Sequence, residues 1–553
     1  MTVWSPLFER WMELSRHSVH RIGVEADIPL KMSDGVYLKS DRFYPLDGRT
    51  SWPTLMIRTP YGRRGLFRYL FAYPFARRGF QVVLQSTRGT HDAEGRFDPF
   101  HHERSDGLET VDWIEGQPWF NGQLIAYGVS YTGYANWSIA AELGDRLQAV
   151  VCGFATCSVR DFAYPGGCFL LHDALHWAAT NADGKFSATR GAWNIIRKID
   201  KKLQKAMYTI PLTLTDQKAI KQEVSFFQDW LHHHPPEDDW WETLEFFPTL
   251  EHVDVPVLMV AGWQDVFLPL QIRDYLRLKE TQTPVSLHVG PWVHTDLQTY
   301  YYTAQAGIPW MKKVIEDAGG FVADPAETHR VRVYLTGNNK WAEAPVFPAE
   351  DDLLTMYLQP EGGLHRALPK ESEPSDFVYD PQEPTPMIGG PSLAQDAGYR
   401  DQKVFESRSD VLVFTGETLS EDCRLLGHAE ATIYTRVSGD YFDVFVRLCD
   451  VDTKGRSVNV SDGVVRICPK TQQPDEEGIY RITLTLSPMG HVFQKGHRLR
   501  VQIAGGAHPR FVRNFGTDEP LPHATSFVPT HRKIFHDPER PSHITLPRWS
   551  QRA

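Results

Sequence analysis

Short apolar runs separated by helical stretches restrict the fold of this 553-residue chain more than any other feature. Runs that are apolar throughout predict strands buried on both faces, and the helical stretches supply the crossovers that parallel strands need. The six runs are PTLMI (53–57), FQVVLQ (80–85), QLIAYGV (123–129), LQAVVCGF (147–154), VPVLMVAGW (255–263) and PVSLHVGPW (284–292). We therefore expect one α/β domain with a parallel sheet, built from residues 1–160 and 247–328.

The segment between these two pieces, residues 161–246, has the apolar spacing of helices, for example in CFLLHDALHWAATNA and FFQDWL. It predicts a helical cap domain inserted between strands. From residue 329 to 553 the apolar and polar residues alternate, as in VRVYLTG, ATIYTRV and RLRVQIAG, and almost nothing helical lies between such runs. This pattern predicts a C-terminal β-sandwich domain of jelly-roll type. The proline-rich stretch 371–391 is interpreted as a long surface loop.

Charge and composition exclude several classes of protein. The net charge of -11 is spread over the whole chain without a basic stripe, so nucleic acid is not an expected partner. Charged residues interrupt the first 23 residues, and no apolar run is long enough for a secretion signal or a membrane span. We expect a cytoplasmic protein without a metal or cofactor, and a homo-oligomer is compatible with the sequence. Sixteen tryptophans and 30 phenylalanines favour large cores and an aromatic-lined pocket.

The stretch YGVSYTG (127–133) suggests a catalytic serine. Gly128 stands two places before Ser130 at the end of an apolar run, as in the nucleophile elbow of an α/β-hydrolase. The usual pattern is G-x-S-x-G, whereas the second glycine here is Gly133, one place late. On this observation alone, Ser130 is either a nucleophile or simply the residue that begins a helix.

Two further residues make the nucleophile hypothesis stronger. Asp265 follows the apolar run VLMVAGW, and His294 follows SLHVGPW. A serine nucleophile needs a base and an acid that orients the base, and in α/β-hydrolases the acid and then the histidine follow the serine along the chain. Because the carboxyl ends of parallel strands meet at one edge of a sheet, these three residues are expected to lie together.

The chain resembles the cocaine esterase/X-prolyl dipeptidyl peptidase (CocE/NonD) family over nearly its whole length. The resemblance is carried by RTPYGRRG, QSTRGTHDAEGRF, DGLETVDWIEGQPWFNG, GVSYTGYANW, AGWQDVF, GPWVH, VRVYLTGNNKWAEAPVFP and GHRLRVQIAGGAHPRFVRNFGT. The elbow of this family is G-x-S-Y-x-G, which accounts for the position of Gly133. The resemblance implies an α/β-hydrolase domain with a helical cap and a jelly-roll domain.

The resemblance also implies roles for individual residues. Ser130 would be the nucleophile, His294 the general base and then acid, and Asp265 the carboxylate that orients the histidine. The oxyanion would be held by the backbone N–H of Tyr131 and the hydroxyl of Tyr61, which follows the strand PTLMIRT. The family places an acyl-pocket aromatic at the position of Phe267.

Other clusters of polar residues are interpreted as structural. HHHPPEDD (232–239) contains possible metal ligands, but its two prolines break regularity and a cap loop is preferred. HDAEGRFDPF (91–100) is acidic, and we do not expect it to bind calcium. The arginines of RTPYGRRG are interpreted as a solvated or salt-bridged surface. Arg88 and Asp92 are expected to brace the loop beneath the elbow.

The residues after Asp265 bear on the substrate. The α-amino-acid ester hydrolases of the family carry carboxylates there, to hold the substrate's ammonium group, whereas this chain has Val266, Phe267, Leu268 and Pro269. A buried ammonium group without a carboxylate is disfavoured, so an ester with an uncharged hydrophobic or aromatic acyl group is the expected small-molecule substrate. The cap carboxylates Asp161 and Asp173 are in range by sequence and leave an amine site open.

Three hypotheses follow from the sequence. The first is a serine carboxylesterase, with amidase side activity left open. The second is an X-prolyl dipeptidyl peptidase that uses the same three residues. The third is a jelly-roll binding protein with a decayed hydrolase domain, against which the intact Ser130, Asp265, His294 and Tyr61 argue.

Overall fold

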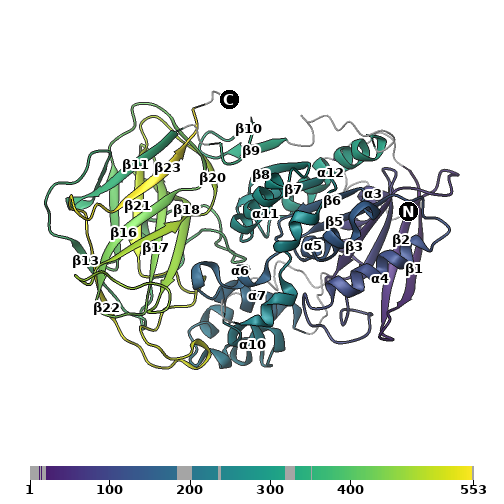
Figure 1. The fold of residues 1–553 in the computed structure, drawn as a ribbon, viewed down its shortest axis with the longest axis horizontal. Helices are drawn as coiled ribbons and strands as arrows, with labels where there is room; N and C mark the ends of the chain where they lie inside the picture. The colour runs from purple at the N-terminus through teal and green to yellow at the C-terminus, as the bar shows by residue number, and fades with distance from the viewer. Residues whose placement is uncertain are drawn as a thin grey trace.

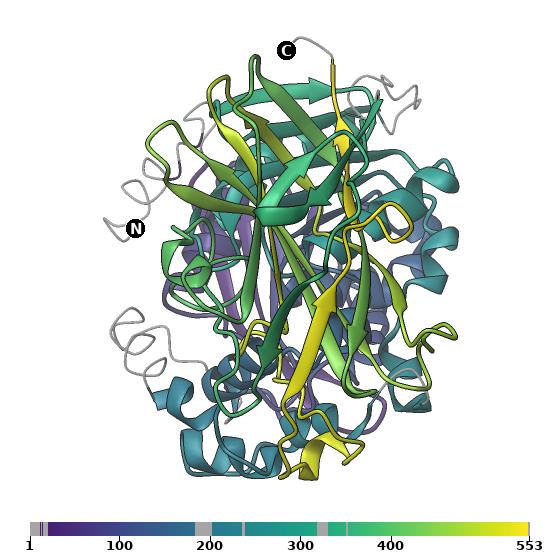
Figure 2. The same ribbon diagram turned by 90° about the vertical axis from the view of Figure 1, so that its left-hand side faces the viewer.

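The computed structural model describes residues 12, 14, 20–182, 202–234, 238–317, 330–349 and 352–550. Figure 1 shows an α/β half that contains the first strands of the chain, an all-β half that contains the C-terminal strands, and a group of helices that lies against both halves. In Figure 2, which looks onto the all-β half, these helices lie below the strands. Among the described residues, no helix has both the length and the apolar character needed to cross a bilayer.

The α/β half is built on a ten-stranded sheet with the order β1-β2-β4-β3-β5-β6-β7-β8-β9-β10. Strands β3 to β9 are parallel, and antiparallel strands border them at both edges. The strands are β1 (Ile22–Lys31), β2 (Tyr37–Pro45), β3 (Thr54–Thr59), β4 (Gln81–Ser86), β5 (Leu124–Val129), β6 (Ala149–Gly153), β7 (Val257–Gln264), β8 (Val285–Val293), β9 (Val331–Leu335) and β10 (Lys340–Ala344). All six apolar runs form strands of this sheet, and the predicted α/β fold is confirmed.

Helices cover both faces of the sheet. The apolar sides of α4, α5 and α11 pack on one face, and those of α2, α3 and α12 pack on the other. The helices are α2 (Leu66–Phe71), α3 (Tyr73–Ala76), α4 (Glu103–Glu115), α5 (Tyr131–Leu143), α11 (Leu268–Glu280) and α12 (Gln298–Asp317). Because both faces are covered, the central strands are buried at every position, which explains their continuous apolar runs.

The inserted segment between β6 and β7 is helical where the structure describes it. It packs on the same core as α5 and α11, so it covers the face of the sheet that carries the elbow helix. Its helices are α6 (Val159–Ala163), α7 (Leu171–Asn181), α9 (Thr215–Ile220) and α10 (Ser225–His232). We call this group the cap.

The C-terminal strands form a sandwich around a core of their own. Neighbouring strands are antiparallel except for the pair β12 and β14. The strands are β11 (Asp352–Gln359), β12 (Gly363–His365), β13 (Ser375–Tyr379), β14 (Val411–Gly416), β15 (Cys423–Gly427), β16 (Glu430–Val437), β17 (Phe442–Val451), β18 (Ser457–Ile467), β19 (Tyr480–Thr485), β20 (Met489–Phe493), β21 (Arg498–Ala504), β22 (Thr530–Ile534) and β23 (His543–Arg548), and the short helix α14 spans Lys403–Glu406. The predicted all-β C-terminal domain is confirmed, and the stretch 371–391 includes strand β13 as well as loop.

One strand expected in the sandwich belongs to the other sheet. The run VRVYLTG forms β9, which pairs in parallel with β8. Its buried residues Val331, Val333 and Leu335 pack on the core of the α/β half, while the alternate residues are half-buried because only β10 lies beyond it. Near the edge of a parallel sheet, a strand therefore shows the same alternation of apolar and polar residues as a strand of a sandwich. The division of the chain at residues 160, 247 and 329 stays a prediction.

Candidate active site

Ser130 stands in a tight turn between β5 and α5. Its φ of 61° lies in the left-handed region that side chains rarely adopt, and such strain is typical of a nucleophile elbow. A Cβ on Gly128 would lie 2.1 Å from the carbonyl oxygen of Thr132, and a Cβ on Gly133 would lie 2.6 Å from the Cβ of Ala155. Both glycines are therefore required by close contacts, which gives the displaced second glycine a physical reason.

The structure brings the three predicted catalytic residues together. Ser130 Oγ lies 2.9 Å from His294 Nε2, and His294 Nδ1 lies 2.7 Å from Asp265 Oδ2. Asp265 is fully buried, and its other oxygen accepts a hydrogen bond from the backbone N–H of Phe267. Because Asp265 and His294 each follow the last residue of β7 or β8, the sheet delivers both side chains to the edge where β5 presents Ser130.

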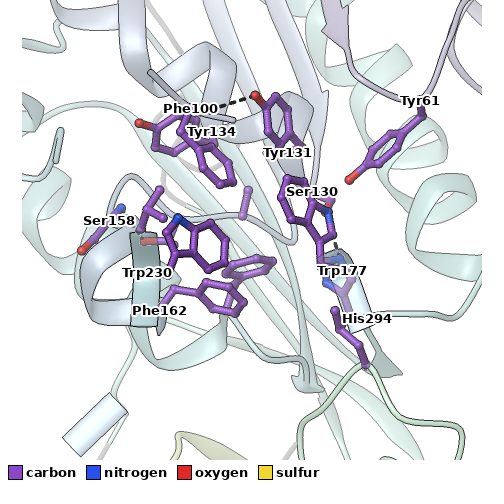
Figure 3. Close-up of a pocket in the computed structure, with 15 residues that line it drawn as sticks. Tyr61, Phe100, Ser130, Tyr131, Tyr134, Ser158, Phe162, Trp177, Trp230 and His294 are labelled. Carbon is purple, nitrogen blue, oxygen red and sulfur yellow. Dashed lines mark hydrogen bonds between the residues drawn. The ribbon is translucent and has the colours of Figure 1, made fainter. Parts of the chain in front are cut away.

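Tyr61 lies on the opposite side of Ser130 from His294, and its hydroxyl points toward the serine (Figure 3). This hydroxyl is hydrogen-bonded to the side chains of Ser130 and Trp177. Because an indole N–H can only donate, the phenol accepts from Trp177 and can donate its own proton toward Ser130. Burial raises the pKa of Tyr61 above its usual value although these hydrogen bonds oppose the shift, so the phenol stays a neutral donor.

Tyr131 is the first residue of α5, where backbone N–H groups have no acceptor within the helix. Its N–H therefore lies beside Ser130 without a helical partner and can donate to an oxygen bound there. The arrangement offers two donors near the serine, a neutral phenol and a backbone N–H.

A cavity adjoins Ser130 and His294 (Figure 3). Its side chains come from all three parts of the chain, and among the described residues that line it there is no carboxylate. The lining is Tyr61, Phe100, Ser130, Tyr131, Tyr134, Ala155, Thr156, Ser158, Val159, Phe162, Trp177, Trp230, Phe267, His294 and Leu393. The sequence-based expectation of an aromatic-lined pocket is confirmed.

The aromatic rings of the cavity are ordered against one another. Trp177 stacks on Trp230 with ring centroids 5.9 Å apart and planes 7° apart, and it also stacks on Phe100 and Tyr131. Phe267 lines the cavity, with its ring 5.2 Å from that of His294. Sequence reasoning missed the cap tryptophans, since a tryptophan in an amphipathic helix resembles any core residue.

Comparison with known proteins agrees with this architecture. Residues 34–296 match the family described as X-Pro dipeptidyl-peptidase (S15 family), and residues 325–545 match the X-Pro dipeptidyl-peptidase C-terminal non-catalytic domain. The cocaine esterase of Rhodococcus sp. (strain MB1 Bresler) is 27% identical, over 95% of this chain and 98% of the relative. The chain belongs to the CocE/NonD family of serine hydrolases. Family membership favours the two enzyme hypotheses over the binding-protein hypothesis.

Solved structures share the whole fold of this CocE/NonD hydrolase. An aminopeptidase from the marine sediment archaeon Thaumarchaeota archaeon has a TM-score of 0.79 at 22% identity, covering 96% of both chains. An α-amino acid ester hydrolase has a TM-score of 0.78 at 21% identity, covering 97% of both chains. At these identities the likeness establishes the fold.

A buried polar network lies beneath the elbow of this CocE/NonD hydrolase. The hydroxyl of Tyr131 donates to Glu103 Oε1 at 2.7 Å, and Glu103 Oε2 lies 2.9 Å from the guanidinium of Arg58, which is 1% exposed. Arg88 pairs with Asp106, which lies on α4 together with Glu103, and it also pairs with Asp34. The expectation that Arg88 braces the loop beneath the elbow agrees with these contacts.

The three arginines of RTPYGRRG form salt bridges, as one of the two sequence-based interpretations stated. Two of them are buried and do not lie on the surface. Arg58 and Arg63 are buried, and Arg63 pairs with Asp27, Asp41 and Asp92. Only Arg64 is exposed, where it pairs with Asp27. The surface interpretation failed because the carboxylates that neutralise these arginines are distant in the sequence, and sequence reasoning does not identify such pairs.

The two cap carboxylates considered for an amine site lie outside the cavity. Asp161 pairs with Arg160 and Arg273, and Asp173 is fully buried and accepts hydrogen bonds from other protein groups. One of the carboxyl groups behind the cavity wall is that of Glu245, which is hydrogen-bonded to the lining residue Ser158 and to the backbone N–H of Arg160. No sequence signal pointed to Glu245, because only the folded cap brings it to this wall.

Glu245 predicts a specific pH dependence of stability. Burial raises its pKa to about 7 although hydrogen bonds from Ser158 and Arg160 oppose the shift, so the folded protein holds this proton more tightly than the unfolded chain. The stabilisation is complete below the unfolded pKa and is lost as pH rises through the folded pKa. Relative to Glu245→Gln, the wild type should therefore lose about 1 to 3 kcal/mol of unfolding free energy between pH 4.5 and 7.5.

Urea unfolding of both proteins across this pH range measures the effect. Glu242→Gln is the matched control, because Glu242 is exposed on the short helical segment that ends just before Glu245 and should leave the pH profile unchanged. Parallel profiles for the wild type and Glu245→Gln would show that Glu245 ionises normally.

Neither polar stretch considered for metal binding forms a ligand cluster where it is described. In HHHPPEDD, His233 Nδ1 lies 2.8 Å from Asp238 Oδ2 and its ring stacks on Trp240, while residues 235–237 lie outside the described residues. In HDAEGRFDPF, Asp92 pairs with Arg63. Over the described parts of the chain, no three His, Cys, Asp or Glu side chains are grouped to hold a metal ion.

Proposed function

We propose that this CocE/NonD hydrolase cleaves carboxylic esters of uncharged aromatic or other hydrophobic acyl groups, through an acyl-enzyme on Ser130. The observation that carries the proposal is the cavity beside Ser130, which is lined by aromatic rings and lacks a carboxylate among its described residues. An acyl group attached to Ser130 would extend into this cavity.

The contacts of Ser130 support a two-step acyl transfer. His294 accepts the proton of Ser130 through Nε2 while Oγ attacks the ester carbonyl, and the buried carboxylate of Asp265 stabilises the imidazolium that forms. The carbonyl oxygen becomes an oxyanion that accepts hydrogen bonds from Tyr61 Oη–H and Tyr131 N–H. His294 then gives its proton to the leaving alkoxide, and the C–O bond of the ester breaks.

The same groups then hydrolyse the acyl-enzyme, with water in place of the alcohol. His294 removes a proton from a water molecule that attacks the acyl carbonyl, and the second oxyanion uses the same two donors. When this intermediate collapses, the proton returns to Ser130 Oγ and the carboxylic acid is released. One ester and one water are thereby converted into one acid and one alcohol.

The lining favours a neutral acyl group for an energetic reason. Burying an ammonium group in an apolar cavity is strongly unfavourable unless a carboxylate pairs with it. Asp161 and Asp173 are occupied by other partners, and Glu245 lies behind Ser158 with its pKa raised to about 7 by burial, so it is only partly ionised near neutral pH. Aromatic faces such as Trp177 and Trp230 instead favour a flat or bulky hydrophobic group.

An X-prolyl dipeptidyl peptidase is the second candidate. The matched family descriptions favour it, since both name this activity. Such a substrate carries a free N-terminal ammonium group, for which the cavity lining supplies no anionic partner. A proline-directed dipeptide such as Gly-Pro-p-nitroanilide distinguishes this candidate from the esterase.

Two p-nitrophenyl esters with the same carbon skeleton test the proposal. The 3-phenylpropanoyl ester is neutral, whereas the phenylalanyl ester adds an α-ammonium group. After correction for their rates with hydroxide, we expect kcat/KM to favour the neutral ester by a factor on the order of 100 or more, because the ammonium group would be buried without a partner. A preference for the phenylalanyl ester or for Gly-Pro-p-nitroanilide would overturn the acyl-group assignment, while labelling by a fluorophosphonate tests Ser130 independently.

A further inference from the structure

A closed loop of the C-terminal half reaches the cavity. The backbone N–H of Gly390 donates to the carbonyl of Gly398, and the N–H of Gly398 donates back to Gly390, both at 2.8 Å. This pair closes the base of the loop on the sandwich, where Asn459 also holds Arg400. Its tip carries Leu393, which lines the cavity.

The tip of the loop is held by a carboxylate of the cap. Asp173 Oδ1 accepts hydrogen bonds from the backbone N–H of Leu393 at 2.8 Å and from Ser392 Oγ at 2.7 Å. His172 Nδ1 lies 2.9 Å from the same oxygen. Asp173 and Ser392 are fully buried and His172 is 3% exposed, so water does not compete for these bonds. One oxygen thus joins the cap to the backbone next to a cavity-lining side chain.

Helix α7 connects this joint to a second cavity-lining side chain, that of Trp177. Asp173 and Trp177 are four residues apart on α7, so their side chains lie on the same face of the helix. Trp177 lines the cavity and stacks on Trp230, and it is also a hydrogen-bond partner of Tyr61. The position of Leu393 relative to Trp177 therefore depends on the bond between Asp173 and the loop.

We propose that Asp173 is a positioning residue that sets the width of the acyl cavity by fixing Leu393 relative to the ring of Trp177. The inference rests on the proposed function only in taking this cavity as the acyl site. The carboxylate does not touch the substrate, and it acts through the backbone of Leu393. The hydrogen bonds of Asp173 thereby fix the position of the cavity wall at the boundary between the cap and the sandwich.

The ionised state of Asp173 is consistent with this positioning role. Although burial opposes ionisation, hydrogen bonds from His172, Ser392 and Leu393 hold the pKa of Asp173 below its usual value. A buried carboxylate that loses these donors would keep its desolvation cost without compensation. Separating the carboxylate from the loop would therefore cost free energy, and this cost keeps the loop in place.

The experiment compares large and small groups in the cavity. p-Nitrophenyl methylphosphonates and benzylphosphonates place a methyl or a benzyl group in the acyl site when they phosphonylate Ser130, and their inactivation rate constants are measured. We expect Asp173→Ala to lower the benzyl-to-methyl ratio roughly tenfold, the size of effect that one misplaced methylene produces in an apolar pocket. Leu393→Ala should lower the ratio similarly, and the double variant should add little to either.

Conservative and matched control variants separate positioning from folding. Asp173→Asn keeps an oxygen that can accept from Leu393, so it should retain most of the ratio and supplies a second variant if Asp173→Ala does not fold. Asp216→Ala is the control, because Asp216 is another fully buried cap carboxylate that accepts a backbone hydrogen bond, from Val224, without touching the cavity loop. It should lower stability and leave the ratio unchanged.

The outcomes are distinct. An unchanged ratio in Asp173→Ala, with a lowered ratio in Leu393→Ala, would overturn the positioning role. Equal loss of the ratio in Asp173→Ala and Asp216→Ala would also overturn it, since cap destabilisation would then explain both. If the wild type is phosphonylated but hydrolyses neither ester, the proposed substrate class fails while the effect of Asp173 on the ratio is still measured.

Discussion

Replacement of Ser130 with alanine should abolish ester hydrolysis while the fold is retained. The substitution removes the atom that lies 2.9 Å from His294 Nε2 and leaves the strained turn in place. Loss of a serine nucleophile typically lowers kcat by a factor on the order of 10⁶, because the remaining catalytic groups act as a unit with it. The measurement is kcat for the p-nitrophenyl ester, with circular dichroism and thermal unfolding of the same preparation.

Ser138→Ala is the matched control for this substitution. Ser138 is also a buried serine of helix α5, but its hydroxyl donates to the backbone of Ala135 and does not line the cavity. Its loss should leave kcat nearly unchanged. If Ser130→Ala keeps a rate within tenfold of the wild type, the nucleophile is a different group.

Replacement of Tyr61 with phenylalanine should lower turnover far more than substrate binding. The ring is kept and only the hydroxyl is lost, and the hydrogen bond of this hydroxyl strengthens as the carbonyl oxygen gains charge. Removal of one oxyanion donor typically costs about 10²- to 10³-fold in kcat. The measurement is the rate of the acylation burst, followed separately from steady-state turnover.

Tyr134→Phe provides the comparison, because Tyr134 lines the same cavity but its hydroxyl donates to the carbonyl of Leu244. It should change stability more than the acylation rate. A Tyr61→Phe variant with a lowered melting temperature and a normal acylation burst would show that Tyr61 is structural. The Tyr131 N–H would then need a different second donor.

The sequence predicted that the candidate catalytic residues would meet because each directly follows the end of a strand. Ser130, Asp265 and His294 all follow buried strands, and the order of parallel strands then determines that they meet. Features that depend on contacts between distant segments were missed. Glu103 beneath the elbow and Leu393 in the cavity have no local pattern that marks them, and β9 was placed in the wrong sheet because its alternation fits either environment.

The joint between the two sheets limits how the molecule can move. Strand β20 continues onto the corner of β9 and β10, where Thr336 N–H donates to Gly490 and Val492 N–H donates to Thr336. The indole N–H of Trp263 on β7 donates to the backbone carbonyl of Tyr334. Gly490 has no side chain and leaves room for the ring of Trp263. A hinge opening of the sandwich away from the α/β sheet would break these two backbone hydrogen bonds and separate the Trp263 ring from Gly490. Admission of substrate without such an opening would require smaller motions of the cap and of the cavity side chains.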